Sequence, residues 1–273
     1  MSDIRILAVA AGRGGTGKST LAFAVADVLR HMDGNSPLDV ALVDLDPQAG
    51  LTGYAKKAPA ANPLHDPPVD VHGIRLYRGG RALAHATDVE IEAHLERALA
   101  GSAERVLVVD MAPALTDAAH RVVFARDDVM LLGAIRTEPG SFQSLNELVT
   151  FVSKRGLPYL LVPTIHRKVL LSDTMLLAMR QQHPEHVSDV VIPLDGKAAE
   201  CVIDGKPVTM YAKRSKAAQA VRQLVDEIFG VASGKPEALS SIADAEEAEP
   251  AVKSGKTPTD QSSARIQTDR MEA

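Results

Sequence analysis

Cysteine and aromatic residues are scarce in this chain. Cys201 is the one cysteine, tryptophan is absent, and aromatic residues make up 3% of the 273 residues. A single cysteine excludes an internal disulfide, a CxxC redox pair and a cysteine-based cluster within one chain, and it favours a reducing compartment. Hydrophobic residues still amount to 45%, so we expect a large core built mainly from Leu, Val, Ile and Ala.

Long apolar runs and an excess of positive charge are also missing. No stretch approaches the ~20 apolar residues that a membrane span needs, and the chain passes from Asp3 through a short apolar run directly into a glycine-rich loop. We therefore expect a cytoplasmic protein with no signal peptide and no additional DNA-binding domain before that loop. The net charge is −5, from 30 Lys plus Arg and 35 Asp plus Glu, so any nucleic-acid-binding surface must be local.

Short runs rich in Val, Ile and Leu alternate with longer amphipathic runs over most of the chain. This alternation predicts an α/β fold, with a doubly wound, mostly parallel sheet flanked by helices. The expected strands are 4–10, 40–45, 74–77, 106–110, 129–132, 159–163 and 187–192, and the expected helices are 18–32, 89–100, 116–125, 141–154, 171–182 and 215–229. We predict one domain over residues 1–232, with a mobile surface loop at 56–68, and a disordered polar tail at 233–273.

A glycine-rich loop follows the first expected strand. Its sequence, Gly12-Arg13-Gly14-Gly15-Thr16-Gly17-Lys18-Ser19, fits the GxxxxGK[ST] pattern of phosphate loops and lies between a strand and a helix, as that pattern requires. The glycines let the backbone curl around phosphate oxygens, and the N-terminus of the next helix faces the anion. Lys18 is predicted to reach the β- and γ-phosphates, Ser19 to bind Mg²⁺, and Thr20 to belong to the nucleotide-binding residues.

Two later segments place carboxylates at strand ends. Asp44 and Asp46 alternate at the end of the expected strand 40–45, and alternate positions of an extended chain point to the same side. Asp110 ends the apolar run 106–110, an arrangement in which a buried strand delivers an acid to the Mg²⁺ shell. Either segment taken alone could be an ordinary strand end, and each gains weight from its order after the phosphate loop.

Together these segments resemble the ParA/MinD family of deviant Walker A P-loop ATPases, and ParA-type partition ATPases in particular. Arg13 stands where the family's KGGxGK[ST] loop has its signature lysine, Asp44-Leu45-Asp46-Pro47-Gln48 matches its DxDPQ element, and Asp110-Met111-Ala112-Pro113 varies its DxPP element. Further similarities lie at 74–83, at 138–145, and in a C-terminal series made of Ile192-Pro193, Glu200, Gly205-Lys206-Pro207-Val208 and Ser215. The resemblance implies that ATP and Mg²⁺ are bound and that two copies form a sandwich dimer around two nucleotides.

The resemblance also assigns roles to the carboxylates. It implies that Asp46 orients the attacking water and joins Ser19 and Asp110 in the Mg²⁺ shell. Asp44 would support the surroundings of Mg²⁺ and Lys18.

Arg13 carries the least direct of these assignments. The resemblance implies that its side chain crosses the dimer interface to the partner's phosphates, although an arginine fork is not interchangeable with an ammonium group. The alternative is that Arg13 points into solvent or pairs with a nearby acid such as Asp110 or Glu138.

A basic run follows residue 205 in this acidic chain. No acidic residue lies between Gly205 and Val225, where the basic residues are Lys206, Lys213, Arg214, Lys216 and Arg222. Such an excess favours non-specific contacts with DNA phosphates, although a solvated helix face would look similar. The basic amphipathic helix expected of a membrane-bound, MinD-like switch is not found at the end of the chain.

The expected function is a slow ATPase, stimulated by a centromere-binding or other adaptor protein, that partitions plasmid or chromosome DNA and is associated with the nucleoid. One alternative is a switch that positions another cargo, such as a protein microcompartment, a chemoreceptor cluster or a conjugation apparatus. A second is a metabolic P-loop ligase or small-molecule kinase. A third is a binding module with weak catalysis, in which Arg13 has altered the dimer.

Overall fold

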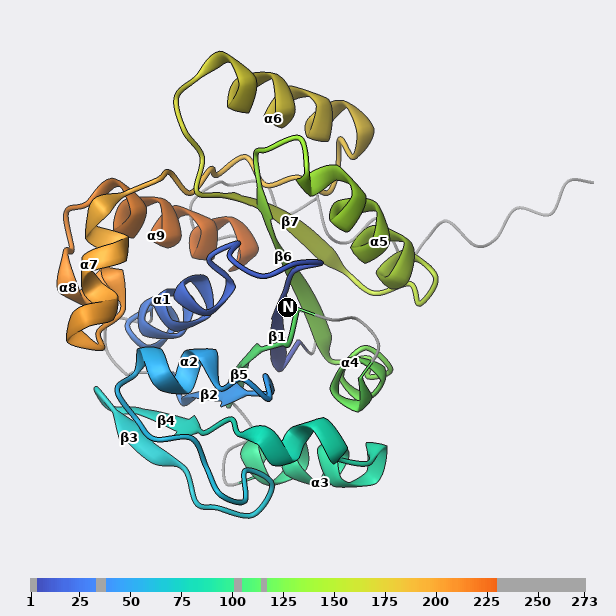
Figure 1. Ribbon diagram of the computed structural model, residues 1–273, viewed down its shortest axis with the longest axis vertical. Helices are drawn as coiled ribbons and strands as arrows, with labels where there is room; N and C mark the ends of the chain where they lie inside the picture. Colours follow the sequence, from blue (N-terminus) through green and yellow to red (C-terminus); the bar gives the residue numbers. More distant parts are fainter. Residues whose placement is uncertain (1–3, 33–37, 101–104, 114–116, 230–273) are drawn as a thin grey trace, which may run out of the picture. The chain divides into compact units, whose positions relative to one another are not determined.

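A computed structural model describes residues 4–32, 38–100, 105–113 and 117–229 (Figure 1). The predicted tail at 233–273 lies outside the described residues. Seven strands form one sheet in the order β3-β4-β2-β5-β1-β6-β7, and all neighbours are parallel except β3 and β4. The strands are β1 (Ile6–Ala10), β2 (Val40–Asp44), β3 (Val69–Val71), β4 (Ile74–Tyr77), β5 (Val106–Asp110), β6 (Val129–Arg136) and β7 (Tyr159–Thr164). The doubly wound, mostly parallel sheet is therefore confirmed.

Helices connect the strands and cover both faces of the sheet (Figure 1). In chain order they are α1 (Lys18–Arg30), α2 (Gly50–Tyr54), the 3₁₀ helix η1 (Arg81–His85), α3 (Asp88–Leu99), α4 (Ala118–Val123), α5 (Ser141–Ser153), α6 (Leu170–Gln182), α7 (Gly196–Asp204), α8 (Val208–Tyr211) and α9 (Lys216–Phe229). The six predicted helices are all present, with ends that differ from the prediction by a few residues at most.

The central strands are buried on both faces because their side chains alternate between two cores. In β1, Leu7 and Val9 pack with α1, α8 and α9 on one face, whereas Ile6 and Ala8 pack with α3, α4 and α5 on the other. A strand covered on both faces needs a continuous apolar sequence, which explains why these strands read as unbroken hydrophobic runs. The strand order reverses at β1, which lies between β5 and β6. In open α/β sheets, ligands bind beyond the carboxyl ends of the strands at such a reversal.

The predicted strand at 187–192 does not form. This segment runs beside β7, but only isolated bridges pair Leu161 with Val187 and His166 with Pro193. Between them, Ser188 Oγ donates a hydrogen bond to a carboxylate oxygen of Glu227 in α9 at 2.6 Å. The Asp189 N–H donates to Glu227 Oε1 at 3.1 Å and the Val190 N–H donates to Ser188 Oγ at 3.0 Å, so neither is available to β7. Pro163 in β7 also has no N–H to donate to this segment. The prediction was wrong because a tertiary contact from α9 overrides the local β-propensity.

Five short elements, β3, α2, η1, α7 and α8, were not predicted. The hairpin between β3 and β4 turns at His72 and Gly73, which both have positive φ, 54° and 82°, as two-residue hairpin turns require. The segment 56–68 is irregular as expected, although Ala60 and Leu64 in it are buried. Ala60 N–H also donates to the Gly79 carbonyl at 2.9 Å, so part of this loop is attached to the domain.

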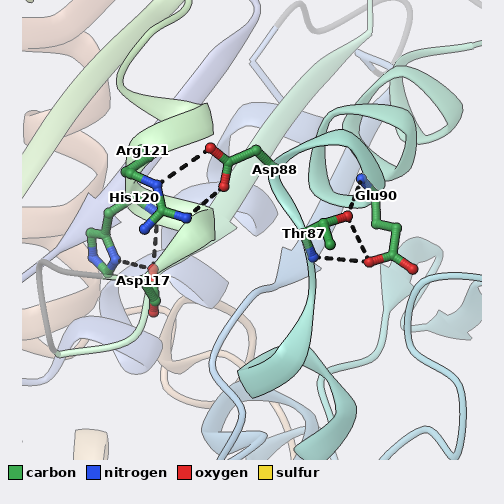
Figure 2. A network of polar contacts seen from close by, with 6 residues as sticks. All are labelled: Thr87, Asp88, Glu90, Asp117, His120 and Arg121. Carbon is green, nitrogen blue, oxygen red and sulfur yellow. Dashed lines mark hydrogen bonds and ion pairs between the residues drawn. The ribbon is translucent and has the colours of Figure 1, made fainter.

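Polar contacts connect α3 and α4 (Figure 2), which pack on the face of the sheet opposite α1. Asp117 caps α4 by accepting hydrogen bonds from the His120 N–H at 2.9 Å and from His120 Nδ1 at 2.6 Å. Arg121 then binds Asp88, in the first turn of α3, through two nitrogens at 2.6 and 3.3 Å. This ion pair connects α4, the helix that follows Asp110 in the chain, to α3.

Candidate functional site

The phosphate loop connects β1 to α1 at the centre of the sheet. Gly15 and Gly17 have φ values of 75° and 83°, a conformation that costs glycine little and other residues much more. A Cβ on Gly12 would come within 2.5 Å of the Ser144 carbonyl oxygen in α5, whereas a Cβ on Gly14 or Gly15 would meet nothing within 4 Å. Gly12 is thus required for packing, and the backbone at Gly14 and Gly15 borders open space that an anion can occupy.

Lys18 and Ser19, in the first turn of α1, both contact the carboxylate that ends β5. Lys18 Nζ donates to Asp110 Oδ1 at 2.7 Å, and Ser19 Oγ donates to Asp110 Oδ2 at 2.6 Å. Asp110 is fully buried and Lys18 nearly so. Burial raises the pKa of Asp110, and the Lys18 ammonium opposes that shift. The structure therefore brings together three residues predicted from two separate segments of the sequence.

Asp44 ends β2 beside Asp110, its register partner in β5. The Thr52 N–H and Oγ donate to Asp44 Oδ2 at 2.8 and 2.6 Å, and the Asp46 N–H donates to Oδ1 at 3.1 Å. The Gly79 N–H in turn donates to Thr52 Oγ at 2.9 Å, and a Cβ at Gly79 would come within 2.7 Å of Asp44 Cγ. Asp44 thus fixes α2 and the turn after β4 at the edge of the site.

Thr52 and Gly79 were missed by sequence reasoning. The spacing of eight residues between Asp44 and Thr52 follows no periodicity that marks a contact. The Gly79-Gly80 pair, one residue after the expected strand 74–77, was the available signal for a close backbone approach.

The acids at the strand ends carry more charge than Lys18 can balance. Burial, and after it the charge of Asp110, raises the pKa of Asp44 to about 7. Asp46 is also buried, its Oδ1 accepts the Gln48 N–H at 2.8 Å, and its charge acts on Asp110. A divalent cation beside Ser19 and these carboxylates would offset the excess negative charge.

The described side chains alone do not make a complete metal site. No group of three His, Cys, Asp or Glu residues is placed to hold an ion within the described ranges. This agrees with Mg²⁺ chemistry, because Mg²⁺ is usually held by one or two protein oxygens together with substrate phosphates and water. Oxygen donors from Ser19, Asp46 and Asp110 fit such a shared shell.

Arg13 in the phosphate loop pairs with an acid of its own chain. Its Nη2 lies 3.0 Å from Glu138 Oε2, and Arg136 contacts the other oxygen, Oε1, of the same carboxylate. Arg136 Nη1 also lies 3.5 Å from the Gly15 carbonyl oxygen. Within the single chain Arg13 therefore pairs with Glu138, which is one of the two acids that the sequence offered as alternative partners.

An apolar cavity of about 270 Å³ opens beside Gly17 and Thr20. Its walls come from α1, the end of β7, the 192–195 segment, α7 and α9, and they include Leu21, Ile165 and Val202. No sequence motif marked this cavity, because its walls come from segments nearly 200 residues apart that the fold brings together.

The predicted DNA-binding residues fall into two groups. Lys213, Arg214 and Lys216 are exposed around the turn between α8 and α9, and Arg222 donates to the Lys213 carbonyl. Lys206 instead lies between α7 and α8 and pairs with Asp204 at 3.4 Å.

The surroundings of this basic surface are less positive than the sequence alone indicated. A groove of about 500 Å³ that Lys213 and Arg222 line also contains Asp27 and Asp226.

In the part of the chain that the structure describes, no helix is long and apolar enough to cross a bilayer.

A phosphate loop between the central strand and its helix, with acids delivered by the two neighbouring parallel strands, defines a P-loop nucleotide-binding protein. Comparison with known families agrees, because residues 7–86 match the CobQ/CobB/MinD/ParA nucleotide binding domain. The resemblance to the ParA/MinD family is thus confirmed, and it is carried at the family level by residues 7–86.

Individual proteins are similar over most of the chain. The chromosome partitioning protein ParA of Caulobacter vibrioides is 24% identical over 262 residues, which cover 84% of this chain and 95% of that protein. The fold is shared with apo McdA from Cyanothece, with a TM-score of 0.69, 18% identity and coverage of 83% of this chain and 100% of that one. It is also shared with cobyrinic acid a,c-diamide synthase from Mycobacterium smegmatis with bound ADP and magnesium, with a TM-score of 0.65, 21% identity and coverage of 83% and 94%.

Proposed function

We propose that this protein is a ParA-type ATPase that binds ATP and Mg²⁺ at the loop from Gly12 to Thr20. The observation that carries the proposal is the convergence of Lys18, Ser19 and Asp110 within hydrogen-bond distance at the carboxyl ends of β1 and β5. The loop N–H groups and Lys18 would hold the phosphates. Bound Mg²⁺ would neutralise phosphate charge, and Asp46 would orient the attacking water.

The apolar cavity beside Gly17 is the proposed site of the adenine base. It lies where a nucleotide on the phosphate loop would extend past Thr20 and Leu21 of α1. Its apolar walls suit the faces of a planar aromatic base, which binds in the mostly apolar pockets that ligands favour. The rim residues Leu194 and Val202 are exposed, so base binding would cover apolar surface that water now contacts.

The proposed dimer places two copies face to face around two nucleotides. The Arg13 side chain would then give up its contact with Glu138 and reach the phosphates of the partner's nucleotide. The attraction between this guanidinium and the partner's ATP exists only in the dimer, so ATP binding shifts the monomer–dimer equilibrium towards the dimer. The same guanidinium would stabilise charge that develops during phosphoryl transfer.

DNA partition is the proposed task, with Lys213, Arg214 and Lys216 as the core of a surface that binds DNA without sequence preference. The likeness to a chromosome partitioning protein over 84% of this chain supports this choice, and so does the exposure of the three basic side chains. A centromere-binding adaptor would stimulate slow hydrolysis. The protein would then act in the cytoplasm, on the nucleoid.

DNA retention in three nucleotide states tests this proposal. The purified protein is applied to immobilised DNA of unrelated sequence with ATP and Mg²⁺, with ADP and Mg²⁺, or without nucleotide. Of the three conditions, only ATP with Mg²⁺ should give strong retention, and Lys18→Ala should lose it. Equal retention in the three states would contradict a nucleotide-controlled grip on DNA.

The metabolic alternative is favoured by one observation, the equally extensive fold similarity to a diamide synthase. Such an enzyme would turn over ATP in the presence of a small acceptor and an amide donor, without DNA or an adaptor. ATP hydrolysis that rises when DNA is added, with no acceptor or amide donor present, would support the switch. Hydrolysis that rises only when an acceptor and an amide donor are added would support the metabolic enzyme. A switch that positions another cargo would pass the DNA test, and its adaptor would have to be identified by co-purification.

A further inference from the structure

The connection between β6 and α5 lies directly against the phosphate loop. Arg13 Nη2 is 3.0 Å from Glu138 Oε2. A Cβ on Gly140 would come within 3.3 Å of Arg13 Nη1, and a Cβ on Gly12 would come within 2.5 Å of the Ser144 carbonyl oxygen. The first two residues of the phosphate loop are therefore packed on residues 138–144, so the position of Arg13 depends on this connection.

The Glu138 carboxylate uses one oxygen for each of two guanidinium groups. Oε2 accepts from Arg13 and Oε1 accepts from Arg136, the last residue of β6. Arg136 is the more buried partner, with a side-chain exposure of 24%, against 35% for Arg13 and 38% for Glu138. Arg136 thereby fixes Glu138 from the sheet side, and Arg13 occupies the outer position.

The outer contact is well suited to exchange. Ion pairs between partly exposed side chains are weak and are screened by salt, whereas arginine binds phosphate through charged, often bidentate hydrogen bonds. Within the described residues, the Nε atoms of Arg13 and Arg136 have no hydrogen-bond partner. Arg13 therefore has donor capacity left, and leaving Glu138 would not strand that carboxylate because Arg136 remains on it.

We propose that Glu138 is a positioning residue for Arg13, holding its guanidinium on its own subunit until ATP-dependent dimerisation offers it the partner's phosphates. This inference rests on the proposed dimer. It explains why Arg13 is directed at an acid of its own chain although its proposed role lies across the interface. The contact stabilises the free monomer relative to the dimer, and the phosphates of the partner's ATP must supply enough differential affinity to outweigh it.

The test compares dimer dissociation constants with a saturating, non-hydrolysable ATP analogue and Mg²⁺, by light scattering or sedimentation. Glu138→Gln keeps the shape of the side chain and removes its charge. Two such contacts break per dimer, and each exposed pair contributes about 1.4-fold to 5-fold, so the dimer should tighten by about 2-fold to 25-fold. Glu147→Gln, which removes an exposed carboxylate on α5 away from Arg13, is the matched control and should change nothing.

The dependence on Arg13 separates positioning from a general effect of charge. In an Arg13→Ala background, Glu138→Gln should leave the dimer constant unchanged, because no guanidinium remains to be released. ADP affinity should stay within about twofold of wild type in Glu138→Gln, because the Arg13–Glu138 contact is lost on dimerisation and not on binding of ADP to the monomer. Circular dichroism checks folding, and Glu138→Asp, which keeps the charge on a shorter arm, should lie between Gln and wild type.

Each outcome decides between the inference and the function on which it rests. A wild-type protein that does not dimerise with the ATP analogue would remove the proposed function and this inference together. A wild-type dimer that Glu138→Gln does not tighten would overturn the role of Glu138 alone. The same tightening in the Arg13→Ala background would also overturn it.

Discussion

The chain up to Asp110 and the chain from β6 onward contribute to the nucleotide site in different ways. In the first region, strands β1, β2 and β5 end at buried carboxylates or at the phosphate loop, and the polar side chains bond to one another inside the domain. The second region contributes the Glu138 connection, a wall of the apolar cavity and the basic turn, which are all partly exposed.

Exposed apolar side chains follow the same division. Of the large hydrophobic residues that are exposed in the described chain, Val89 alone lies in the first region, and the others are Val169, Leu170, Leu171, Leu177, Leu194, Val202 and Ile203. The first region is completed by its own contacts, whereas the second presents surface that a nucleotide, another subunit or DNA can cover. The variants below therefore test whether nucleotide chemistry belongs to the first region and association to the second.

Lys18→Ala should have the largest effect. It removes the ammonium expected at the β- and γ-phosphates, and charged hydrogen bonds of this kind contribute about 1.5–3 kcal/mol each, so ATP affinity should fall by about 100-fold or more. Titration with a fluorescent ATP analogue measures this. Lys197→Ala, at an exposed lysine that pairs with Glu200 on α7, is the control. Near-normal ATP affinity in Lys18→Ala would show that the phosphate-loop assignment is wrong.

The first region was also the more predictable one. The strand ends at Asp44 and Asp110 and the loop from Gly12 to Ser19 follow from local patterns, because parallel strands bring their carboxyl ends to one edge of the sheet. The fold and these contacts could therefore be expected from sequence. The bonds from Thr52 to Asp44 could not, since they join positions with no regular spacing.

The second region shows why the remainder was missed. The segment 187–192 has β-branched residues but bonds to Glu227 of α9, a contact that no local pattern reveals. The helix α7 had a readable start and end, since Asp195 caps it by accepting the Lys197 N–H at 2.9 Å and Gly205 ends it with a φ of 67°. The cavity wall was beyond prediction because it exists only after β7, α7 and α9 have packed.

The stability of the first region should depend on pH through His94. This side chain in α3 is buried against Tyr77, and burial, followed by the charge of Arg97, lowers its pKa to about 4. Because its pKa is near 6.5 in the unfolded chain, the unfolded state binds the extra proton first as pH falls. The stabilising contribution is complete above about pH 6.5 and is lost progressively towards pH 4, by about 3 kcal/mol at most.

Denaturant unfolding of wild type and His94→Gln at pH 7 and pH 4.5 measures this dependence. The variant has no imidazole to protonate, so its stability should fall less between the two values. His85→Gln is the control, because His85 is exposed and is not among the groups that shift the pKa of His94. Parallel losses in wild type and His94→Gln would assign the acid sensitivity to other groups.

Asp46→Ala should separate nucleotide affinity from turnover. ATP binding should stay within a few-fold of wild type, because the phosphates are assigned to Lys18 and the loop, whereas hydrolysis should slow by about 100-fold, as expected when a water-positioning group is lost. The dimer should then persist with ATP. Single-turnover hydrolysis together with light scattering gives both quantities. Normal turnover would move the role to another carboxylate, Asp44 being the next candidate.

The smallest effect is expected from the second region, in Lys213→Ala, Arg214→Ala and Lys216→Ala combined. These side chains are exposed around the turn before α9, so their removal should spare folding and ATP affinity while weakening DNA binding on every sequence. Each lost phosphate contact lowers the slope of log affinity against log salt by about 0.9. Fluorescence anisotropy at several salt concentrations measures that slope, with Lys206→Ala as the comparison, because Lys206 already pairs with Asp204 and should contribute less. An unchanged slope in the triple variant would exclude this turn from the DNA-binding surface. A large loss of ATP affinity would show that the two regions are not separable.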